Sequence, residues 1–485
     1  MSHEVPRRPV CRALPGVLLP LLALTLAFAF TGCASGPDYK APALPETAAG
    51  PFVSRPSQVD AGSPPPADWW RLYDDPALDA IVQEALSANT DLRVAMANLD
   101  RARAIYGEAR GAMLPSTAVT TGVTRGRDQT SWDGQGQAPV QWNYTGGLDI
   151  SYELDLFGRV RREMEAASGD AEATAAACDG VKVVVAAETT RAYVDACAYG
   201  ASLDVARSSV ELAQQALDVV SHQERAGSAS RLDVERSGSL LAQARASVPR
   251  LQARQDAALF ELAALMGRTP SQIPESARAC NRVPDIADVI PVGDGTAMLR
   301  RRPDIRQTER RLSADTARIG VAVADLYPRV ALGASASLLR NDDLRGDRTV
   351  SFAFGPLISW TFPNMTVARS RVAQARAQGV ASLARFDGVV LTALKECEQS
   401  LGTYEGAVEQ RNALVQAQTH AENAFGLAEQ RYRAGAVSYL DVIAAQDSLI
   451  RARAQVATAD QQVGSARIDV FKALGGGWKE RPAVE

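Results

Sequence analysis

The chain has very little histidine, the side chain that most often acts as a catalytic acid or base in enzymes. It has three histidines in 485 residues, and only His222 and His420 lie beyond the N-terminal segment. Both lie in helical patterns without metal-ligand spacing, and no nucleophile elbow, His-Glu-x-x-His motif or phosphate-binding loop is present. We therefore expect no enzymatic activity, no metal site and no cofactor other than a covalent lipid.

Excess charge and aromatic residues are also scarce. The net charge is -4 with a pI near 5.7, so nothing indicates a nucleic-acid-binding surface. Aromatic residues make up only 6% of the chain, while alanine is frequent. This composition favours long, closely packed helices over a globular core.

Cysteine is used sparingly as well. Beyond the N-terminal segment the chain has Cys178, Cys197, Cys280 and Cys397. If Cys178 and Cys197 share one helix, their separation of 19 residues corresponds to roughly 28 Å, which is beyond disulfide reach. No metal spacing occurs among the four, and we interpret all of them as small side chains that pack between helices.

The only long apolar run lies at the N-terminus. Arg7, Arg8 and Arg12 precede the run 17–30, which is too short and too interrupted by Pro20 to span a membrane. This order is typical of a signal peptide, so residues 1–32 are expected to be removed.

A cysteine stands at the expected cleavage point. The segment Phe30-Thr31-Gly32-Cys33 resembles a bacterial lipobox, with Phe30 in place of the usual leucine. The resemblance implies diacylglycerol and an N-acyl chain on Cys33, whereas an ordinary signal peptide with a chance cysteine is the alternative. Ala34 rather than aspartate follows, which by resemblance favours the outer membrane. Residues 33–90 would then form a lipid-anchored N-terminal segment.

The rest of the chain is one unit repeated twice. Arg225-Ala226-Gly227 recurs as Arg433-Ala434-Gly435, at an offset of 208 (433 − 225), and the same offset holds for about 120 residues. Farther upstream Pro115 matches Pro328 at an offset of 213, so the first copy has five extra residues before Gly147. The repeats are predicted at 91–270 and 304–478.

Each repeat contains a predicted β-hairpin, at about 116–153 and 329–361. In the first, Tyr144, Leu148 and Ile150 alternate with polar or small residues; the second shows the same period of two. Strands with one apolar face and one face of polar or small residues are typical of transmembrane barrels.

Helices are predicted to follow each hairpin, at about 158–267 and 366–474. No proline occurs between Pro363 and Pro482, and a helix over 366–432 would be roughly 100 Å long. Apolar and small residues then continue a heptad seam to the end of each copy, and Pro249 is expected to kink its helix without ending it.

Together these patterns predict a mixed α/β membrane protein that works as an assembly. Four strands per chain cannot close a barrel, because single-chain barrels begin at about eight strands and open edges are not tolerated in lipid. Several copies must therefore share one barrel, and the helices must continue its wall as a conduit across the periplasm.

Four segments carry a family resemblance that spans nearly the whole chain expected after cleavage. They are Gly36-Pro37-Asp38-Tyr39-Lys40-Ala41-Pro42, Trp69-Trp70-Arg71-Leu72-Tyr73-Asp74-Asp75-Pro76, Tyr152-Glu153-Leu154-Asp155-Leu156-Phe157-Gly158-Arg159 and Arg301-Arg302-Pro303-Asp304-Ile305-Arg306. Their order resembles lipoproteins of the TolC-like outer-membrane factor family, the exit ducts of tripartite efflux pumps. The resemblance implies a homotrimer with a twelve-stranded barrel and a helical periplasmic tunnel. It also implies a periplasmic adaptor and an inner-membrane transporter of the resistance-nodulation-division class.

Asp441, Asp447 and Asp233 are the candidate pore residues. The family places acidic residues at the periplasmic tip, where three symmetry-related carboxylates would form a gate sensitive to cations. It often has a further acid three residues after the position of Asp441; here that residue is Ala444, and Asp447 is the substitute. The spacing of Ser438 and Asp441, repeated by Ser230 and Asp233, also fits a capping box, so helix capping is by itself an adequate explanation of both acids.

The two Arg-Ala-Gly turns are candidates for contact with the adaptor, through Arg225, Gly227, Arg433 and Gly435. Each glycine is expected to end its helix in a left-handed conformation, whether or not the turn binds a partner. Trp69 and Trp70 are expected to pack on the helices.

Two other functions fit parts of the pattern. A duct for one-step protein secretion would use the same architecture, although the lipid anchor and the Gly-Pro-Asp-Tyr start favour a small-molecule pump. A static lipoprotein that ties the outer membrane to the cell wall would need the helices but not the alternating strands.

Overall fold

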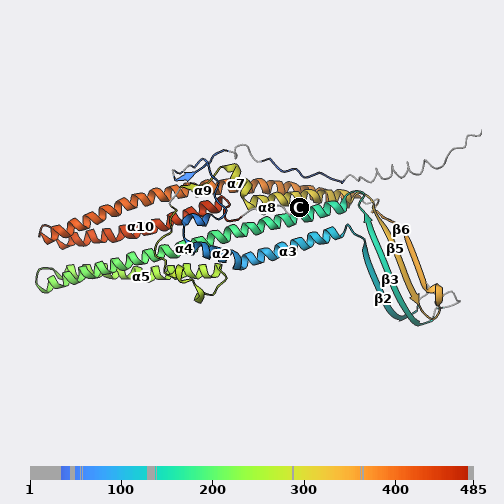
Figure 1. Ribbon diagram of the computed structural model, residues 1–485, viewed down its shortest axis with the longest axis horizontal. Coiled ribbons are helices and arrows are strands. Elements are labelled where there is room, and N and C mark those ends of the chain that lie inside the picture. The colour runs from blue at the N-terminus through green and yellow to red at the C-terminus, as the bar shows by residue number, and fades with distance from the viewer. Residues whose placement is uncertain are drawn as a thin grey trace, which may run out of the picture. The chain divides into compact units, whose positions relative to one another are not determined.

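The computed structural model describes residues 34–43, 50–54, 56, 58–127, 137, 139–286, 289–360, 362 and 365–478 (Figure 1). Long helices and one four-stranded sheet dominate these residues. In chain order the elements are β1 (Val59–Asp60), η2 (Trp69–Tyr73), α2 (Pro76–Ala88), α3 (Thr90–Gly111), β2 (Ser116–Gly126), β3 (Gln141–Leu154), α4 (Arg159–Arg225), α5 (Arg231–Leu265), η3 (Pro270–Gln272), α6 (Glu275–Arg278), β4 (Ile290–Pro291), α7 (Gly295–Arg301), α8 (Pro303–Ala324), β5 (Arg329–Arg340), η4 (Gly346–Thr349), β6 (Val350–Ser359), α9 (Met365–Arg433) and α10 (Tyr439–Ala473).

The chain folds into two compact units. The strand unit comprises Ala102–Ala171, Arg311–Leu383 and the described residues up to Ala41. The helix unit comprises the described parts of Pro42–Arg101, Glu172–Arg310 and Ala384–Glu485. Several long helices contribute to both units.

The strand unit contains the two predicted hairpins. Its sheet is antiparallel with the order β2-β3-β5-β6, so the second strand of the first hairpin pairs with the first strand of the second (Figure 1). The alternation of apolar and polar side chains explains the strands, because successive residues of a strand point to opposite faces.

Both hairpins have the same register. Thr120 pairs with Gly147 in the first hairpin, and Gly333 pairs with Gly355 in the second. These two pairs are related by the offsets of 213 and 208 found in the sequence. The five extra residues of the first copy therefore lie in its hairpin connection and leave the strand pairing unchanged.

The helix unit contains two helical hairpins, α4–α5 and α9–α10, whose turns lie at the same end of this unit (Figure 1). All members of the predicted seam of α10 are buried except Val456, which is half-buried; the seam consists of Leu449, Ala452, Val456, Ala459, Val463, Ala466, Val470 and Ala473. Pro249 lies inside α5, and the helix continues past it to Leu265 as predicted. The 69 residues of α9 correspond to about 100 Å of helix contour.

Aromatic residues anchor the segment before the first repeat onto these helices. Trp69 is fully buried and stacks on Phe471 of α10, with ring centroids 4.6 Å apart. Trp70 is also buried and donates from its indole nitrogen to Asp79 at 3.0 Å. The prediction that both tryptophans pack on helices is confirmed.

The long helices mix polar and apolar residues along their whole length. Among the described residues, no helix is both long enough and apolar enough to cross a membrane. Within the same part of the chain, no three histidine, cysteine or acidic side chains gather in a way that could hold a metal ion.

Candidate functional site

The sheet of the strand unit presents one broad apolar face to its surroundings. Side chains that pair directly across an antiparallel sheet point to the same side, so the register defines this face. We call it the apolar face; its large exposed members are Val119, Val123, Trp142, Tyr144, Leu148, Ile150, Leu332, Leu338, Val350, Phe352, Phe354 and Ile358. Phe352 and Phe354 are the most exposed of them, at 86% and 78%.

The opposite face consists mostly of polar or small side chains, with Leu339 and the exposed Leu357 as exceptions. One row across all four strands consists of Thr120, Gly147, Ser337 and Ser351. The strands β2 and β6 form the two edges, and within the described residues neither pairs with a further strand. A sheet with one exposed apolar face and two unpaired edges is unstable in water, because apolar area and backbone polar groups both lack partners.

The residues directly after position 33 pack tightly against the strand unit. The Ser35 amide donates to the carbonyl oxygen of Phe157 at 3.0 Å, and the buried Arg162 donates to the Ser35 carbonyl oxygen at 3.2 Å. A Cβ atom on Gly320 would lie only 2.7 Å from that same carbonyl oxygen. Ala34–Gly36 thus pack closely against Phe157, Arg162 and Gly320 beside the end of β3, and we call this packing site the seat of Ala34–Gly36. Cys33 itself lies outside the described residues.

The two helical turns end as the sequence predicts. Gly227 and Gly435 have φ of +74° and +69°, a left-handed conformation that glycine adopts without strain. The amide of Ser228 donates to the Gln223 carbonyl at 2.8 Å and that of Ala436 to the Arg431 carbonyl at 2.9 Å, which completes a Schellman motif at each end.

The arginines of these turns are exposed to solvent. Arg225 donates to the carbonyl oxygen of Ser221 at 3.2 Å, and Arg433 lies 3.3 Å from the carboxylate of Glu429. These contacts are local to each helix end, so both turns remain open to a partner.

Capping boxes hold the two repeated aspartates. The Ser438 amide and hydroxyl donate to Asp441 at 2.9 and 2.7 Å, and those of Ser230 donate to Asp233 at 3.2 and 2.6 Å. The capping interpretation is therefore confirmed for both residues. Asp441 is nevertheless exposed, whereas Asp447 is half-buried and paired with Arg451 at 2.5 Å.

The cap at Asp233 should make stability depend on pH. The hydroxyl hydrogen bond from Ser230 holds the pKa of Asp233 below its ordinary value. The cap therefore stabilises fully above the unfolded pKa, near 3.9, and is lost as the pH falls through the lower folded pKa. Asp233→Asn should cost about 1 kcal/mol at neutral pH, and this cost should vanish in acid.

Thermal unfolding of both proteins across this pH range measures the effect. The control is Glu235→Gln, which removes a carboxylate of the same turn whose ion pair with Arg231 is largely exposed. If the control lost the same amount of stability with the same pH dependence, the effect would come from removing any negative charge in this turn and not from the cap.

Two tyrosines, which the sequence patterns did not single out, fix the α9–α10 turn onto α4. The Tyr432 hydroxyl donates to the side-chain oxygen of Gln223 at 2.6 Å, and the Tyr439 hydroxyl donates to the Ala216 carbonyl at 2.9 Å. Burial raises the pKa of Tyr439 to about 12, so its hydroxyl stays protonated and remains a donor. The tips of the two helical hairpins are thus held together by side chains next to Asp441.

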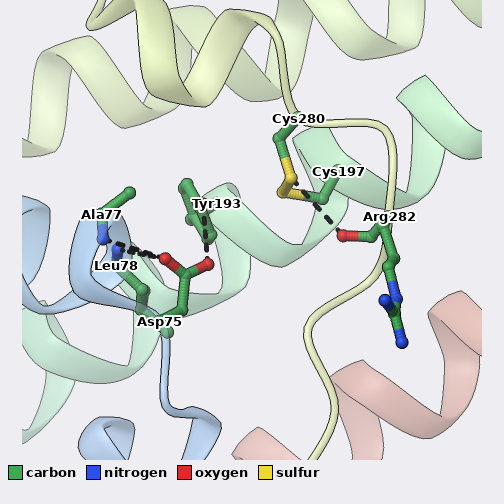
Figure 2. Close-up of a disulfide and its surroundings, with 7 residues drawn as sticks. All are labelled: Asp75, Ala77, Leu78, Tyr193, Cys197, Cys280 and Arg282. Carbon is green, nitrogen blue, oxygen red and sulfur yellow. Dashed lines mark hydrogen bonds between the residues drawn. A yellow bond between two sulfur atoms is a disulfide. The ribbon is translucent and has the colours of Figure 1, made fainter.

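The structure corrects the interpretation of two cysteines. Cys197 of α4 and Cys280, which follows α6, form a disulfide with a Cα–Cα distance of 4.8 Å (Figure 2). These two cysteines are therefore not merely small packing residues. Cys178 and Cys397 fit that interpretation, since both are buried and form no disulfide. A Cβ atom on Gly200 would lie 2.3 Å from the Cys280 carbonyl oxygen, so glycine lets the linker between the repeats lie directly on α4.

Two buried arginines tie the same linker to the end of the second repeat. Arg467 of α10 is 8% exposed, pairs with Asp285 at 2.7 Å and lies over the ring of Tyr73. Arg302 donates to the carbonyl oxygen of Ala473 at 2.8 Å and to the carboxylate of Asp304 at 2.7 Å. The Arg301-Arg302-Pro303-Asp304 segment thus has a structural role in joining the two repeats.

Comparison with known proteins decides the family. The model of the outer membrane efflux protein family matches residues 81–268 and 296–476. The chain belongs to this family.

Relatives match over nearly the full length. The chain is 30% identical over 478 residues to the probable efflux pump outer membrane protein SepC and to the toluene efflux pump outer membrane protein TtgF, both of Pseudomonas putida. In each comparison 94% of this chain and 96% of the relative are covered. Another relative is the antibiotic efflux pump outer membrane protein ArpC of Pseudomonas putida, 30% identical with 95% of this chain and 96% of the relative covered.

Solved structures agree with this assignment. The outer-membrane channel OprN has a TM-score of 0.84 and 32% sequence identity to this chain, and the match covers 92% of this chain and 100% of the OprN chain. The open MtrE channel of Neisseria gonorrhoeae has a TM-score of 0.80 and 26% identity, with 92% and 98% covered. The chain is therefore an outer-membrane efflux channel with the TolC-like fold, and it is not an enzyme.

Proposed function

We propose that three copies of this channel protein form one duct, in which twelve strands close a barrel and the helices continue it through the periplasm. The apolar face with its two unpaired edges carries this proposal. Lipid covers an apolar face favourably, but it does not tolerate open sheet edges. Pairing β6 of each copy with β2 of the next would remove every edge in a closed ring of twelve strands.

The internal repeat gives the register of that contact. Because β6 and β2 are the repeat counterparts of β3 and β5, their pairing should copy the β3–β5 pairing. Ile150 pairs with Ala334 within the chain; transfer by the offsets of 208 and 213 puts Ile358 opposite Thr121 of the next copy.

Cysteine cross-linking tests this arrangement. The variant Thr121→Cys/Ile358→Cys should form covalent trimers under oxidation, visible by gel electrophoresis in denaturing, non-reducing conditions. The control Thr121→Cys/Leu357→Cys puts the second thiol on the opposite face and should stay monomeric. A dimer as the largest product, or equal cross-linking of the control, would contradict the proposed trimer.

The helical turns would bind the rest of the pump. The exposed Arg225 and Arg433, beside Gly227 and Gly435, stand at the end of the helix unit where a periplasmic adaptor could reach them. An inner-membrane transporter of the resistance-nodulation-division class would supply the energy, since the duct itself is passive. Cross-linking from position 225 or 433 in cells should retrieve the adaptor.

We further propose that Cys33 carries the lipid anchor. The seat of Ala34–Gly36 supports this, because it fixes the residue after Cys33 beside the base of the strands, near the inner surface of the membrane in the proposed arrangement. Mass spectrometry of the mature N-terminus should find diacylglycerol and an N-acyl chain on this cysteine. Cys33→Ser should abolish the modification, and an unmodified wild-type cysteine would reject the anchor.

Asp441 is the strongest gate candidate of the three aspartates, because it is exposed and lies in the turn region beside the tyrosines. Three copies would bring three such carboxylates near the axis, where they repel one another and bind cations. Asp441→Ala should raise single-channel conductance in planar bilayers about twofold or more and weaken block by multivalent cations.

Asp233→Ala is the matched control, because it removes the same capping box from the other repeat. If both variants alter conductance equally, the proposal that Asp441 in particular forms the gate is contradicted. Asp447→Ala should have the smaller effect of the two α10 variants, since Arg451 already neutralises its carboxylate.

The cargo is proposed to be drugs or other small molecules, as the names of the relatives suggest for toluene and antibiotics. A strain that lacks this protein should accumulate such compounds several-fold above wild type. Unchanged accumulation of every compound, together with loss of a secreted protein, would favour the protein-secretion duct instead.

A further inference from the structure

We propose that Arg125 and Arg340, on either side of Trp142 and Tyr144, form a binding site for the phosphate groups of a glycolipid in the outer leaflet. The inference rests on the proposed barrel, in which the apolar face meets lipid. It assigns a ligand to one end of that face, where arginines interrupt an otherwise apolar surface.

The register brings these four side chains together. Tyr144 on β3 pairs with Val123 on one side and with Arg340 on the other, and Trp142 pairs with Arg125. Strands are about 4.8 Å apart and residues rise about 3.4 Å, so the two arginines lie roughly 12 Å apart with both aromatic rings between them. All four side chains are exposed.

The position of the cluster along β3 fits the outer boundary of the membrane. Tyr152 follows Trp142 by ten residues on β3, which is about 34 Å of strand and about 26 Å of height at a tilt near 40°. This is close to the height of the apolar band of outer-membrane barrels, about 25 Å, and aromatic residues mark both its borders. Arg125 and Arg340 therefore lie at the level of lipid headgroups, at the end of the strands where the hairpin connections lie.

No carboxylate of the described residues neutralises the charges of this cluster. Among the described residues, neither Arg125 nor Arg340 has a carboxylate oxygen within 4.0 Å. The guanidinium of Arg125 instead lies over the Trp142 ring, 5.7 Å from its centroid, which holds it on the apolar face. By contrast, the loop arginine Arg345 faces Asp342 at 3.5 Å.

This chemistry selects a phosphorylated lipid. Guanidinium groups bind phosphate through paired, charge-assisted hydrogen bonds, and aromatic rings at the same level contact the upper part of acyl chains and sugars. Two cations about 12 Å apart suit a headgroup with two phosphates better than a phospholipid with one.

A binding measurement on the full-length protein tests the site. Purified protein in detergent is incubated with diphosphorylated lipid A or with its dephosphorylated form, and retained lipid is quantified by mass spectrometry after gel filtration. Wild type should retain the diphosphorylated form about tenfold better, and Arg125→Gln/Arg340→Gln should abolish that preference. Equal retention of both lipids by wild type, or an unchanged preference in the variant, would overturn the proposal.

The control variant is Arg345→Gln/Arg348→Gln, which removes two charges at the same end of the sheet but outside the apolar face. This control should keep the preference for the diphosphorylated lipid. An equal loss of that preference would mean that nonspecific electrostatic attraction retains the lipid, and it would overturn the proposed site. A third arm adds excess inorganic phosphate; complete displacement of the lipid would identify free phosphate as the ligand and reject the lipid site.

Measuring the conductance of the same preparations distinguishes a failure of the proposed lipid site from a failure of the proposed duct. A wild-type protein that conducts but shows no lipid preference would overturn the lipid site alone. A protein that neither forms trimers nor conducts would instead overturn the proposed duct on which the site rests.

Discussion

Replacing Cys197 and Cys280 together by serine is expected to lower the free energy of unfolding of the helix unit by up to about 4.5 kcal/mol. The disulfide closes a loop of 83 residues, and its loss lets the unfolded chain explore many more conformations. Cys197 is also completely buried, so a serine hydroxyl there would need a new partner. Denaturant unfolding followed by far-UV circular dichroism measures the loss.

The matched control is the double variant Cys178→Ala/Cys397→Ala, which removes the two buried thiols that form no disulfide and keeps the disulfide. Burial raises the pKa of Cys397 to about 12, so this thiol does not compete as a nucleophile. A reductant should destabilise wild type and this control but not the Cys197→Ser/Cys280→Ser variant. If reductant left all three unchanged, the disulfide would have no part in stability.

Trp69→Ala is expected to cost about 3 to 5 kcal/mol, because it empties the centre of the core that joins the N-terminal segment to the last helix. The ring is fully buried and stacks on Phe471, and a Cβ atom on Gly476 would lie 2.7 Å from it. The wall around the ring is therefore tight and cannot close over the space. Thermal unfolding of the purified variant would show the loss as a lower midpoint.

Trp69→Phe provides the comparison. Phenylalanine keeps most of the stacking and removes an indole N–H that has no hydrogen-bond partner among the described residues. Its cost should stay below about 1.5 kcal/mol. Equal losses in the two variants would mean that the indole edge, and not the volume of the ring, determines stability here.

Much of the fold follows from sequence because its signals are local or repeated. The alternation around Tyr144 and Leu148 identifies a strand by itself, and the constant offset between copies confirms each element through its counterpart. The same holds at the turns, where Gly227 and Gly435 both adopt the left-handed conformation that their context predicts.

The linker between the repeats could not be predicted in this way. Cys197 and Cys280 are 83 residues apart, and Cys280 lies outside both the helical and the alternating patterns. The residue of the second repeat that corresponds to Cys197 is Glu405, so the repeat gives no second example of the bond. For the same reason the burial of Arg467, which depends on Asp285 in that linker, has no sequence signal.

For the candidate site, too, the sequence predicts the local contacts but not those that depend on distant residues or on other chains. Capping at Asp233 and Asp441 follows from residues three positions apart and is present in the structure. A gate formed by Asp441, or adaptor binding by Arg225 and Arg433, depends on other chains, so neither one sequence nor one chain determines it.

The seat of Ala34–Gly36 also bears on the order in which the protein assembles. It is built from Phe157, Arg162 and Gly320, which lie more than a hundred residues farther along the chain, so the N-terminal segment docks only after much of the strand unit has folded. If residue 33 is lipid-linked before that point, the unfolded chain is tethered to a bilayer surface, and its strands search for partners in a thin layer instead of a volume. Tethering of this kind raises the effective concentration of copies for one another, and would favour assembly of the proposed ring over aggregation in the periplasm.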